Sequence, residues 1–267
     1  MIKINMHAMY DHFPDKHPEG GEKCLDFYSD SHIVECVNKG NNKNIAFMLE
    51  PKSMLHSKYQ YVKEHADLFR IIFTHDSELL KLPQARYLNW GDVWLTTDSV
   101  KDKGISICTS YKNWCPLHVA RLELAKCYKD SGIVDSFFGD WNNPQIPNVE
   151  PREYLEHYKF SIVIENDIDD YWYTEKILNC FATKTVPIYV GAKKIYEIFN
   201  DAGIIQIDNV WDIPRIVDHL NVDEAYNNRL AAIEDNFRRV EPYKIPWKER
   251  FFNTYGQLLE DLQNELL

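Results

Sequence analysis

The stretch that decides the fold runs from residue 158 to residue 200: YKFSIVIENDIDDYWYTEKILNCFATKTVPIYVGAKKIYEIFN. It contains two short segments, residues 160–164 and 186–190, that are largely apolar on both faces, which is typical of strands buried in a parallel sheet. A segment with helical spacing, residues 174–183, lies between them, and Thr174 is a suitable N-cap. Strand, helix and strand in this order predict an α/β fold.

The same alternation continues on both sides of this stretch. Further strands are predicted at residues 2–6, 45–49, 70–73, 105–108, 134–138 and 204–207. Helices are predicted at residues 58–65, 77–82, 117–129, 151–157 and 193–199, and in most of residues 223–267. A polar loop, residues 96–104, separates two sets of strand–helix units. We therefore predict an N-terminal α/β domain at residues 1–100, a Rossmann-like domain at 101–245 and a C-terminal helix at 246–267.

Composition narrows the function classes. The 267 residues include 30 Lys and Arg and 41 Asp and Glu, so the net charge is −11. Such a chain repels polyanions, which disfavours a nucleic-acid partner but leaves room for a local anion pocket. No apolar run is long enough to span a bilayer, and the first residues do not resemble a secretion signal. Six cysteines without a C-x-x-C pair indicate reduced thiols, so we expect a cytoplasmic protein.

Polar residues follow both apolar segments of the first stretch. Glu165 and Asn166 come after residues 160–164, and Gly191 comes after residues 186–190 and permits a close backbone approach. In an open parallel sheet, ligands bind beyond the carboxyl ends of the strands. A helix N-terminus that carries Lys176 suits a diphosphate. When the tripeptide Thr174-Glu175-Lys176 is taken alone, an ordinary capped helix is the better explanation.

The whole constellation resembles a known motif. The segments FSIVIEN, YTEKI and TVPIYVG are similar to the donor-binding motif of the α1,3-fucosyltransferase family, and a weaker similarity covers residues 45–210. The resemblance implies a GT-B fold, in which two Rossmann-like domains face each other across a cleft. It also implies inverting transfer of fucose from GDP-fucose to a glycan hydroxyl, with the nucleotide sugar as donor and no separate cofactor. Trp172 stands where the family usually has Tyr.

The resemblance also assigns roles to donor-side residues. Asn166, Glu175 and Lys176 are expected to contact the nucleotide sugar. Tyr171 and Tyr173 flank Trp172, so either neighbour can take the place of the missing family Tyr, and Tyr173 is counted among the donor-binding residues. Arg121 resembles the family Arg that grips the diphosphate. The alternative for Arg121 is a surface salt bridge, but no acid lies three or four residues away along its helix.

Glu50, at the end of the predicted strand 45–49, resembles the proposed catalytic base of the family. Its alternative is a solvated carboxylate before Pro51. The loop of residues 10–23 mixes aromatic, histidine and acidic side chains and is expected to help bind the acceptor, unless it is merely solvated.

Three other interpretations stay open. Asp167 and Asp169 form a D-x-D pattern that holds a metal ion in other glycosyltransferases, but we expect a polar loop here and no metal site. A short chain without an anchor is also compatible with a phage enzyme that glycosylates a hydroxylated DNA base, although the net charge of −11 argues against it. The third interpretation is an inactive module that binds a nucleotide sugar.

Overall fold

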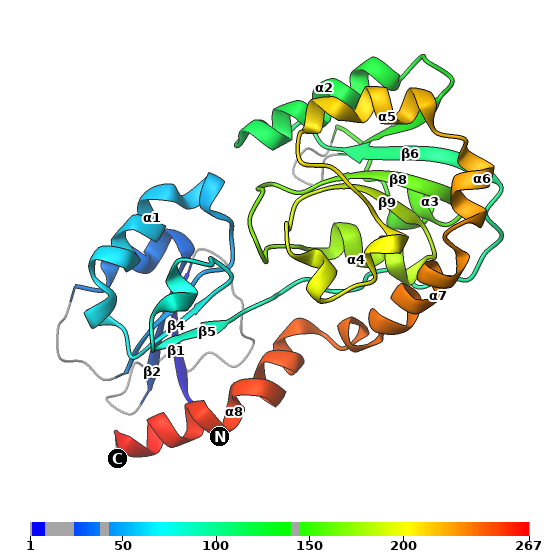
Figure 1. Cartoon of the computed structure of the whole chain (residues 1–267). Coiled ribbons are helices and arrows are strands. Elements are labelled where there is room, and N and C mark those ends of the chain that lie inside the picture. Colours follow the sequence, from blue (N-terminus) through cyan, green and yellow to red (C-terminus); the bar gives the residue numbers. More distant parts are fainter. Residues whose placement is uncertain (1, 9–23, 38–42, 140–144, 267) are drawn as a thin grey trace. The chain divides into compact units, whose positions relative to one another are not determined.

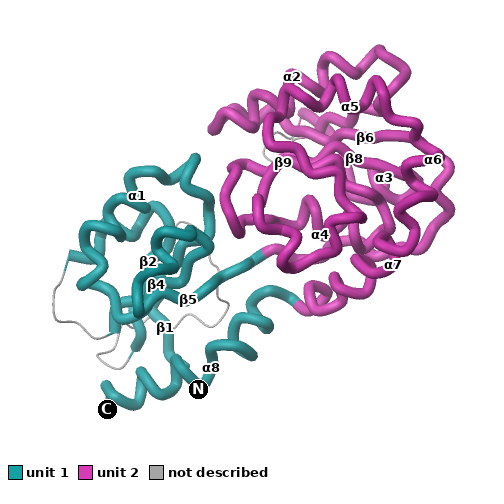
Figure 2. The backbone as a smooth tube through the Cα atoms, viewed as in Figure 1, with its two compact units in different colours: residues 1–90, 246–267 teal, residues 91–245 magenta. Residues whose placement is uncertain are grey.

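The computed structural model describes residues 2–8, 24–37, 43–139 and 145–266. The chain forms two compact units, shown in Figure 2. The first consists of Met1–Trp90 together with Pro246–Leu267, and the second of Gly91–Ile245. Each unit contains a parallel sheet with helices packed against it, so the predicted α/β class is confirmed (Figure 1).

The sheet of the first unit has the strand order β1-β2-β3-β4-β5, and all of its pairs are parallel. Its strands are β1 (Ile4–His7), β2 (Leu25–Ser29), β3 (Asn44–Phe47), β4 (Ile71–Thr74) and β5 (Ala85–Tyr87). Successive side chains of a strand point to opposite faces, so β3 contributes to two apolar clusters. Ala46 packs with helix α1 (Lys52–Glu64), whereas Phe47 packs with helix α8 (Trp247–Glu265).

Helix α8 covers its face of the sheet with aromatic contacts. The Phe251 ring is 3% exposed, and its centroid lies 4.9 Å from that of Phe73 and 5.5 Å from that of Phe47. Leu259 and Leu262 extend the contact along the helix. The C-terminal residues therefore complete the core of the first unit.

The sheet of the second unit has the order β10-β9-β8-β6-β7 and is also parallel throughout. Its strands are β6 (Lys103–Thr109), β7 (Val134–Phe138), β8 (Tyr158–Ile164), β9 (Val186–Val190) and β10 (Ile205–Gln206). Its helices are α2 (Pro116–Tyr128), α3 (Pro151–Leu155), α4 (Glu175–Ala182), α5 (Ile213–His219), α6 (Val222–Asn227) and α7 (Leu230–Arg239).

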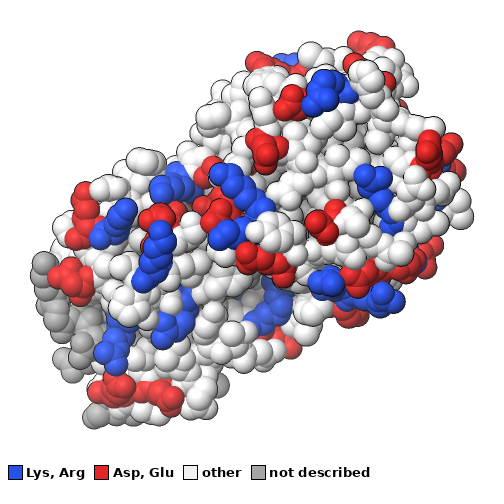
Figure 3. Space-filling model, viewed as in Figure 1, with Lys and Arg blue, Asp and Glu red and all other residues white. Residues whose placement is uncertain are grey.

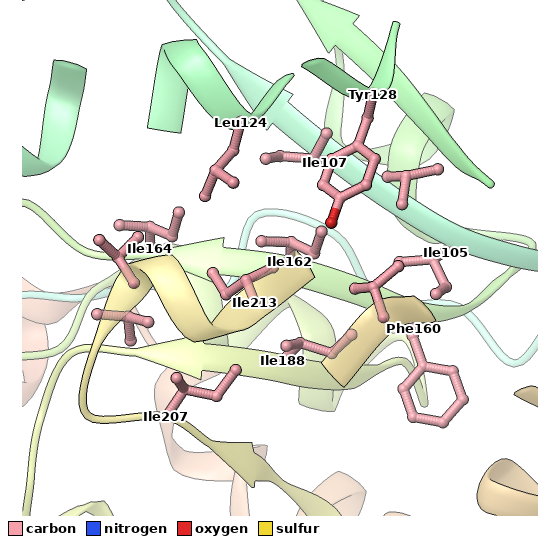
Figure 4. Close-up of a cluster of buried hydrophobic side chains, with 14 of the residues drawn as sticks. Ile105, Ile107, Leu124, Tyr128, Phe160, Ile162, Ile164, Ile188, Ile207 and Ile213 are labelled. Atoms are coloured by element: carbon pink, nitrogen blue, oxygen red, sulfur yellow. The ribbon is translucent and has the colours of Figure 1, made fainter. Parts of the chain in front are cut away.

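Both faces of this sheet are covered by the unit's own helices. On one face, Leu124 of α2 and Ile213 of α5 pack with Ile107, Ile162 and other strand residues (Figure 4). On the other face, helix α4 packs its apolar side against Val163 and Tyr189. This double cover explains why β8 and β9 are apolar at nearly every position.

Strands β2 and β5 and helix α5 were not predicted, and two expected helices have another form. Strand β2 was not predicted because its apolar pattern is interrupted by Asp26, which is buried and pairs with Lys43 at 3.0 Å. Strand β5 has only three residues, too few for a clear pattern. The expected helices at 77–82 and 193–199 are short 3-10 turns.

The structure divides the chain at a different place from the polar loop 96–104. It separates the units after Trp90, because the residues that follow pack on the second unit. The Val93 N–H donates to the Tyr243 carbonyl at 3.0 Å, and the Trp94 N–H donates to Asn179 Oδ1 at 2.7 Å.

Among the helices of the described residues, none combines the length and the apolar content that crossing a membrane requires.

Candidate functional site

The strand order of the second sheet changes direction between β6 and β8. From β6 the chain passes to β7 at one edge, and it then returns to the other side of β6 to form β8 and β9. Helix α2, which follows β6, packs on one face, whereas α4, which follows β8, packs on the other. The two connections therefore diverge at the carboxyl ends of β6 and β8, which is where open α/β sheets bind ligands.

Glu165, the first residue after β8, organises the polar side of this point. Its side chain is fully buried. One carboxylate oxygen accepts the Thr174 backbone N–H at 2.9 Å, and the other accepts the Thr174 hydroxyl at 2.8 Å and the Lys176 ammonium at 3.1 Å. A buried carboxylate is tolerated only with such partners. Glu165 therefore fixes the start of α4.

Two local expectations are confirmed at this point. The Thr174 side chain accepts the Lys176 backbone N–H, so Thr174 is the N-cap of α4. A Cβ atom at Gly191 would lie 2.6 Å from Glu165 Cγ and 2.4 Å from the Tyr189 hydroxyl oxygen. Only glycine permits this close approach of the β9 end to Glu165.

Lys176 is held by carboxylates. Its ammonium lies 3.1 Å from Glu165 and 3.5 Å from Glu175, and it also donates to the Thr174 hydroxyl at 3.0 Å. Burial opposes its charge, but the charges of Glu165 and Glu175 outweigh this effect and raise its pKa. The side chain keeps 25% of its surface exposed. Lys176 therefore stays positively charged and accessible from the solvent side.

Asn166 joins β8 to helix α2. Its Oδ1 atom accepts a hydrogen bond from Arg121 Nη2 at 3.0 Å and lies 2.9 Å from His118 Nε2. Cys115, the N-cap of α2, donates its S–H to the Asn166 carbonyl at 3.3 Å. The structure thus brings Arg121 and Asn166 together, as predicted for two residues of one site.

Arg121 as a whole residue is 8% exposed, and no described residue accepts a hydrogen bond from its buried Nε. Burial lowers the pKa of Arg121, and Glu165 opposes this shift. Burial and the Arg121 charge lower the pKa of His118 to about 4, so its ring is neutral at pH 7. His118 Nδ1 is also buried and lacks a partner within the described residues. Unsatisfied buried groups of this kind mark a place for a ligand or water.

The structure does not bring Tyr173 to this site. Its ring is 1% exposed, lies in the core beside Phe199, and its hydroxyl is 2.6 Å from that of Tyr243. Glu175, by contrast, is the first residue of α4 and lies next to Lys176, so it belongs to the site.

Glu50 lies in the first unit. The strand predicted to end at residue 49 ends at Phe47, and Glu50 stands directly before Pro51, the N-cap of α1. Its backbone N–H donates to Asp30 Oδ1 at 3.2 Å, and its carbonyl accepts the Tyr59 hydroxyl at 2.7 Å. Its role as a base stays a prediction.

The acidic side chains of the loop after β8 are held by contacts within the protein. Asp169 accepts the Tyr171 backbone N–H at 3.1 Å, and Asp170 pairs with Lys194 at 3.2 Å. Within the described ranges, no three His, Cys, Asp or Glu side chains are grouped so as to hold a metal ion. The acceptor loop predicted at residues 10–23 lies outside the described residues.

The sequence did not predict a role in the site for Glu165, His118 or Cys115. A role for Glu165 could have been predicted, because this carboxylate directly follows a strand that is apolar on both faces and therefore lies at the ligand-binding end of the sheet. The evidence for His118 was weaker. It precedes Arg121 by three residues, which places both side chains on one face of a helix.

Comparison with known proteins was informative in sequence and in structure. The model of glycosyltransferase family 10 (fucosyltransferase), C-terminal part, matches residues 100–232. Residues 100–232 belong to this family. The matched range contains Arg121, Asn166, Glu175 and Lys176, and it is about half of the chain.

Two curated relatives are fucosyltransferases. The chain is 26% identical over 92 residues to the alpha-(1,3)-fucosyltransferase FucT of Helicobacter pylori, covering 31% of this chain and 19% of the relative. It is 27% identical over 168 residues to the 4-galactosyl-N-acetylglucosaminide 3-alpha-L-fucosyltransferase 9 of Mus musculus, covering 61% and 44%. The chain therefore spans less than half of the length of either relative.

Among solved structures, the pneumococcal O-GlcNAc transferase GtfA in complex with UDP and GlcNAc matches with a TM-score of 0.56 and 10% identity. The match covers 90% of this chain and 57% of that chain. At this identity the match shows the fold alone, and the predicted GT-B class is confirmed. The resemblance to the fucosyltransferase family is confirmed for residues 100–232, and activity as a glycosyltransferase stays a prediction.

Proposed function

We propose that this protein transfers fucose from GDP-fucose to a glycan hydroxyl with inversion at the anomeric carbon. One observation carries the proposal: within the family-matched residues, Arg121 and Lys176 come from two connections that diverge at the switch point of the sheet. Arg121 reaches it from α2, and Lys176 reaches it from the start of α4. A diphosphate needs positive groups from more than one direction, and this arrangement supplies them.

In this proposal the diphosphate lies between Arg121 and the N-terminus of α4. The first backbone N–H groups of a helix point toward such an anion, and the helix dipole adds to the field. Lys176 supplies a full positive charge. Glu165 holds its ammonium group in place, and the part of Lys176 that stays exposed can reach the diphosphate. Glu175 and the neutral ring of His118 are acceptors for hydroxyl groups of the donor.

In the proposed reaction, Glu50 is the base that takes the proton of the acceptor hydroxyl. The acceptor oxygen forms a bond to the anomeric carbon while the bond from that carbon to the β-phosphate oxygen breaks. The acceptor proton passes to the Glu50 carboxylate, and GDP leaves with the electron pair of the broken bond. The charges of Arg121 and Lys176 stabilise the departing diphosphate, so we expect no requirement for a divalent metal.

The test begins with donor recognition. A ligand that binds only the folded state raises its apparent stability, so GDP is expected to raise the melting temperature, whereas UDP and NAD are not. GDP release from GDP-fucose is then followed with N-acetyllactosamine as the probe acceptor, the sugar named in the mouse relative. Activity in excess EDTA is expected to match activity without it. A shift in melting temperature with UDP alone would contradict GDP-fucose as the donor. GDP binding without transfer would contradict the proposed activity and indicate an inactive module that binds a nucleotide sugar.

A single substitution tests the base. Glu50→Gln keeps the size of the side chain and removes its basicity, so turnover is expected to fall by about 10²- to 10⁴-fold. GDP affinity is expected to stay at the wild-type level, because the carboxylate acts on the acceptor and not on the diphosphate. Glu64→Gln, on the exposed end of α1, is the matched control. If Glu50→Gln turns over like the wild type across the pH range, another residue is the base.

The net charge of −11 disfavours a nucleic-acid acceptor. On the face drawn in Figure 3, basic and acidic side chains are interspersed and no continuous basic band is present. Binding to a phosphate backbone requires such a basic face. We therefore propose a glycan as the acceptor.

A further inference from the structure

Both backbone polar groups of Glu50 are held by side chains from other elements of the first unit. The carboxylate of Asp30, at the end of β2, accepts the Glu50 N–H at 3.2 Å. The hydroxyl of Tyr59, in α1, donates to the Glu50 carbonyl at 2.7 Å. Glu50 thus lies between two polar contacts just before α1 begins. This arrangement restricts how the backbone that carries the carboxylate can move.

Asp30 occupies an unusual backbone conformation. Its φ is +46°, and among the described residues Lys184 is the one other non-glycine residue with positive φ. Its Oδ1 atom accepts the N–H of Leu49 at 2.9 Å as well as that of Glu50. Burial raises the pKa of Asp30 to about 6, and these two N–H groups oppose the shift. Backbone strain of this kind persists where the surroundings over-determine it, often at functional sites.

Tyr59 is itself supported from β4. Its ring is 2% exposed, and its hydroxyl oxygen lies 3.0 Å from Nε2 of His75, which is 1% exposed. The hydroxyl hydrogen is directed to the Glu50 carbonyl, so Nε2 must carry a hydrogen and donate it to the tyrosine oxygen. Burial lowers the pKa of His75 to about 3, so the ring is neutral at pH 7. A neutral histidine therefore orients Tyr59, and Tyr59 orients the Glu50 carbonyl.

We propose that Asp30 and Tyr59 are positioning residues for the Glu50 carboxylate: each holds one backbone polar group of Glu50, and neither touches the substrate. This inference rests on the proposed function, in which Glu50 takes the acceptor proton. General-base catalysis depends on geometry, and a displacement of about 1 Å can cost about 100-fold in rate.

Asp30 offers a pair of variants that separates its carboxylate from its backbone. Asp30→Gly removes the acceptor and accommodates the positive φ without strain, whereas Asp30→Asn keeps an acceptor oxygen and also tolerates the left-handed conformation. We expect Asp30→Gly to lower kcat by about 10- to 100-fold, with the GDP dissociation constant unchanged. Asp30→Asn is expected to restore kcat to within about threefold of the wild type, because the acceptor geometry is retained. Tyr59→Phe is expected to lower kcat in the same way as Asp30→Gly.

The assay is GDP release from GDP-fucose with N-acetyllactosamine, together with GDP titration of each variant. Lys184→Gly, which relaxes the other left-handed residue, is the control and is expected to leave kcat unchanged. Wild-type kcat in both Asp30→Gly and Tyr59→Phe, alongside a slow Glu50→Gln, would overturn the positioning role and leave the proposed function intact. A Glu50→Gln variant as fast as the wild type would overturn both. Equal losses of kcat in Asp30→Asn and Asp30→Gly would also overturn the inference, because the charge and not the acceptor geometry would then be responsible.

Discussion

The two units share an architecture but complete it differently. In the first unit, the strand order follows the chain from β1 to β5, and the segments between its strands that form α1 and the 3-10 turns pack on a single face. Its other face is covered by α8, which comes from the far end of the chain. In the second unit the strand order changes direction, and local helices cover both faces.

This difference has a functional meaning. A sheet whose order changes direction opens a place for a ligand between diverging connections, and Arg121, Asn166 and Lys176 converge there. A sheet with one continuous order has no such point. In the first unit, Asp30, directly after β2, and Tyr59, in α1, instead hold the backbone of Glu50. The donor-side chemistry is thus expected in the second unit.

The largest expected effect concerns α8. Phe251→Ala removes a ring that contacts three phenylalanines of the first sheet, which is expected to cost about 3–5 kcal/mol of stability. Hydrogen exchange resolved by peptide is expected to show lost protection in the strands of the first unit and normal protection in those of the second. Phe252→Ala, at the less buried neighbouring position, is the control with a smaller loss. Equal loss in both units would show that they unfold together and would contradict the comparison.

The next effect concerns the switch point. Arg121→Ala and Lys176→Ala are each expected to weaken GDP binding by about 2 kcal/mol, close to 30-fold, because each removes a charge-assisted contact with the diphosphate. Isothermal titration with GDP measures this change. Lys126→Ala, on the exposed side of α2, is expected to bind like the wild type. Unchanged affinity in both Arg121→Ala and Lys176→Ala would place the diphosphate elsewhere.

The smallest effect is the acid sensitivity contributed by His75. Burial lowers its pKa in the folded protein to about 3, below the value of an unfolded histidine, so the unfolded chain binds more protons between these values. The contribution of neutral His75 to the free energy of unfolding is fully present above pH 6.5, and it is lost as the pH falls below this value. The loss between pH 7 and pH 5.5 is expected to be about 1.3 kcal/mol.

Urea unfolding at the two pH values measures this loss. His75→Gln keeps a donor for the Tyr59 oxygen and does not titrate, so its stability is expected to fall less than that of the wild type over the same interval. His56→Gln, at an exposed position of α1, is expected to behave like the wild type. Identical pH dependence in wild type and His75→Gln would refute the assignment.

The sequence predicted the fold best where both faces of a strand are buried. Strand β9 has the predicted bounds, because its apolar run is continuous, buried throughout and ends at Gly191. Strand β2 escaped prediction because Asp26 is buried through partners from other elements, Asn5 and Lys43. Pairings between distant segments of this kind leave no local pattern.

The site shows the same limit. Asn166, Glu175 and Lys176 belong to one motif, and the structure brings them to the end of β8 and the start of α4, which are adjacent in the chain. The contact of Tyr173 with Tyr243 leaves no local pattern, because Tyr243 lies 70 residues away in the chain. The neighbouring aromatic residues Trp172 and Tyr173 are both buried. Their spacing in the sequence does not distinguish a ring of the core from a ring that contacts a ligand.

The position of α8 in the chain also sets an order of events during synthesis. The strands of the first unit leave the ribosome first, yet the helix that covers one of their faces emerges after the entire second unit. Until then Phe27, Phe47 and Phe73 have no Phe251 to pack against. Domains generally fold as they emerge, and exposed apolar surface promotes aggregation. The second unit can therefore complete its fold before the first, which reverses their order in the sequence.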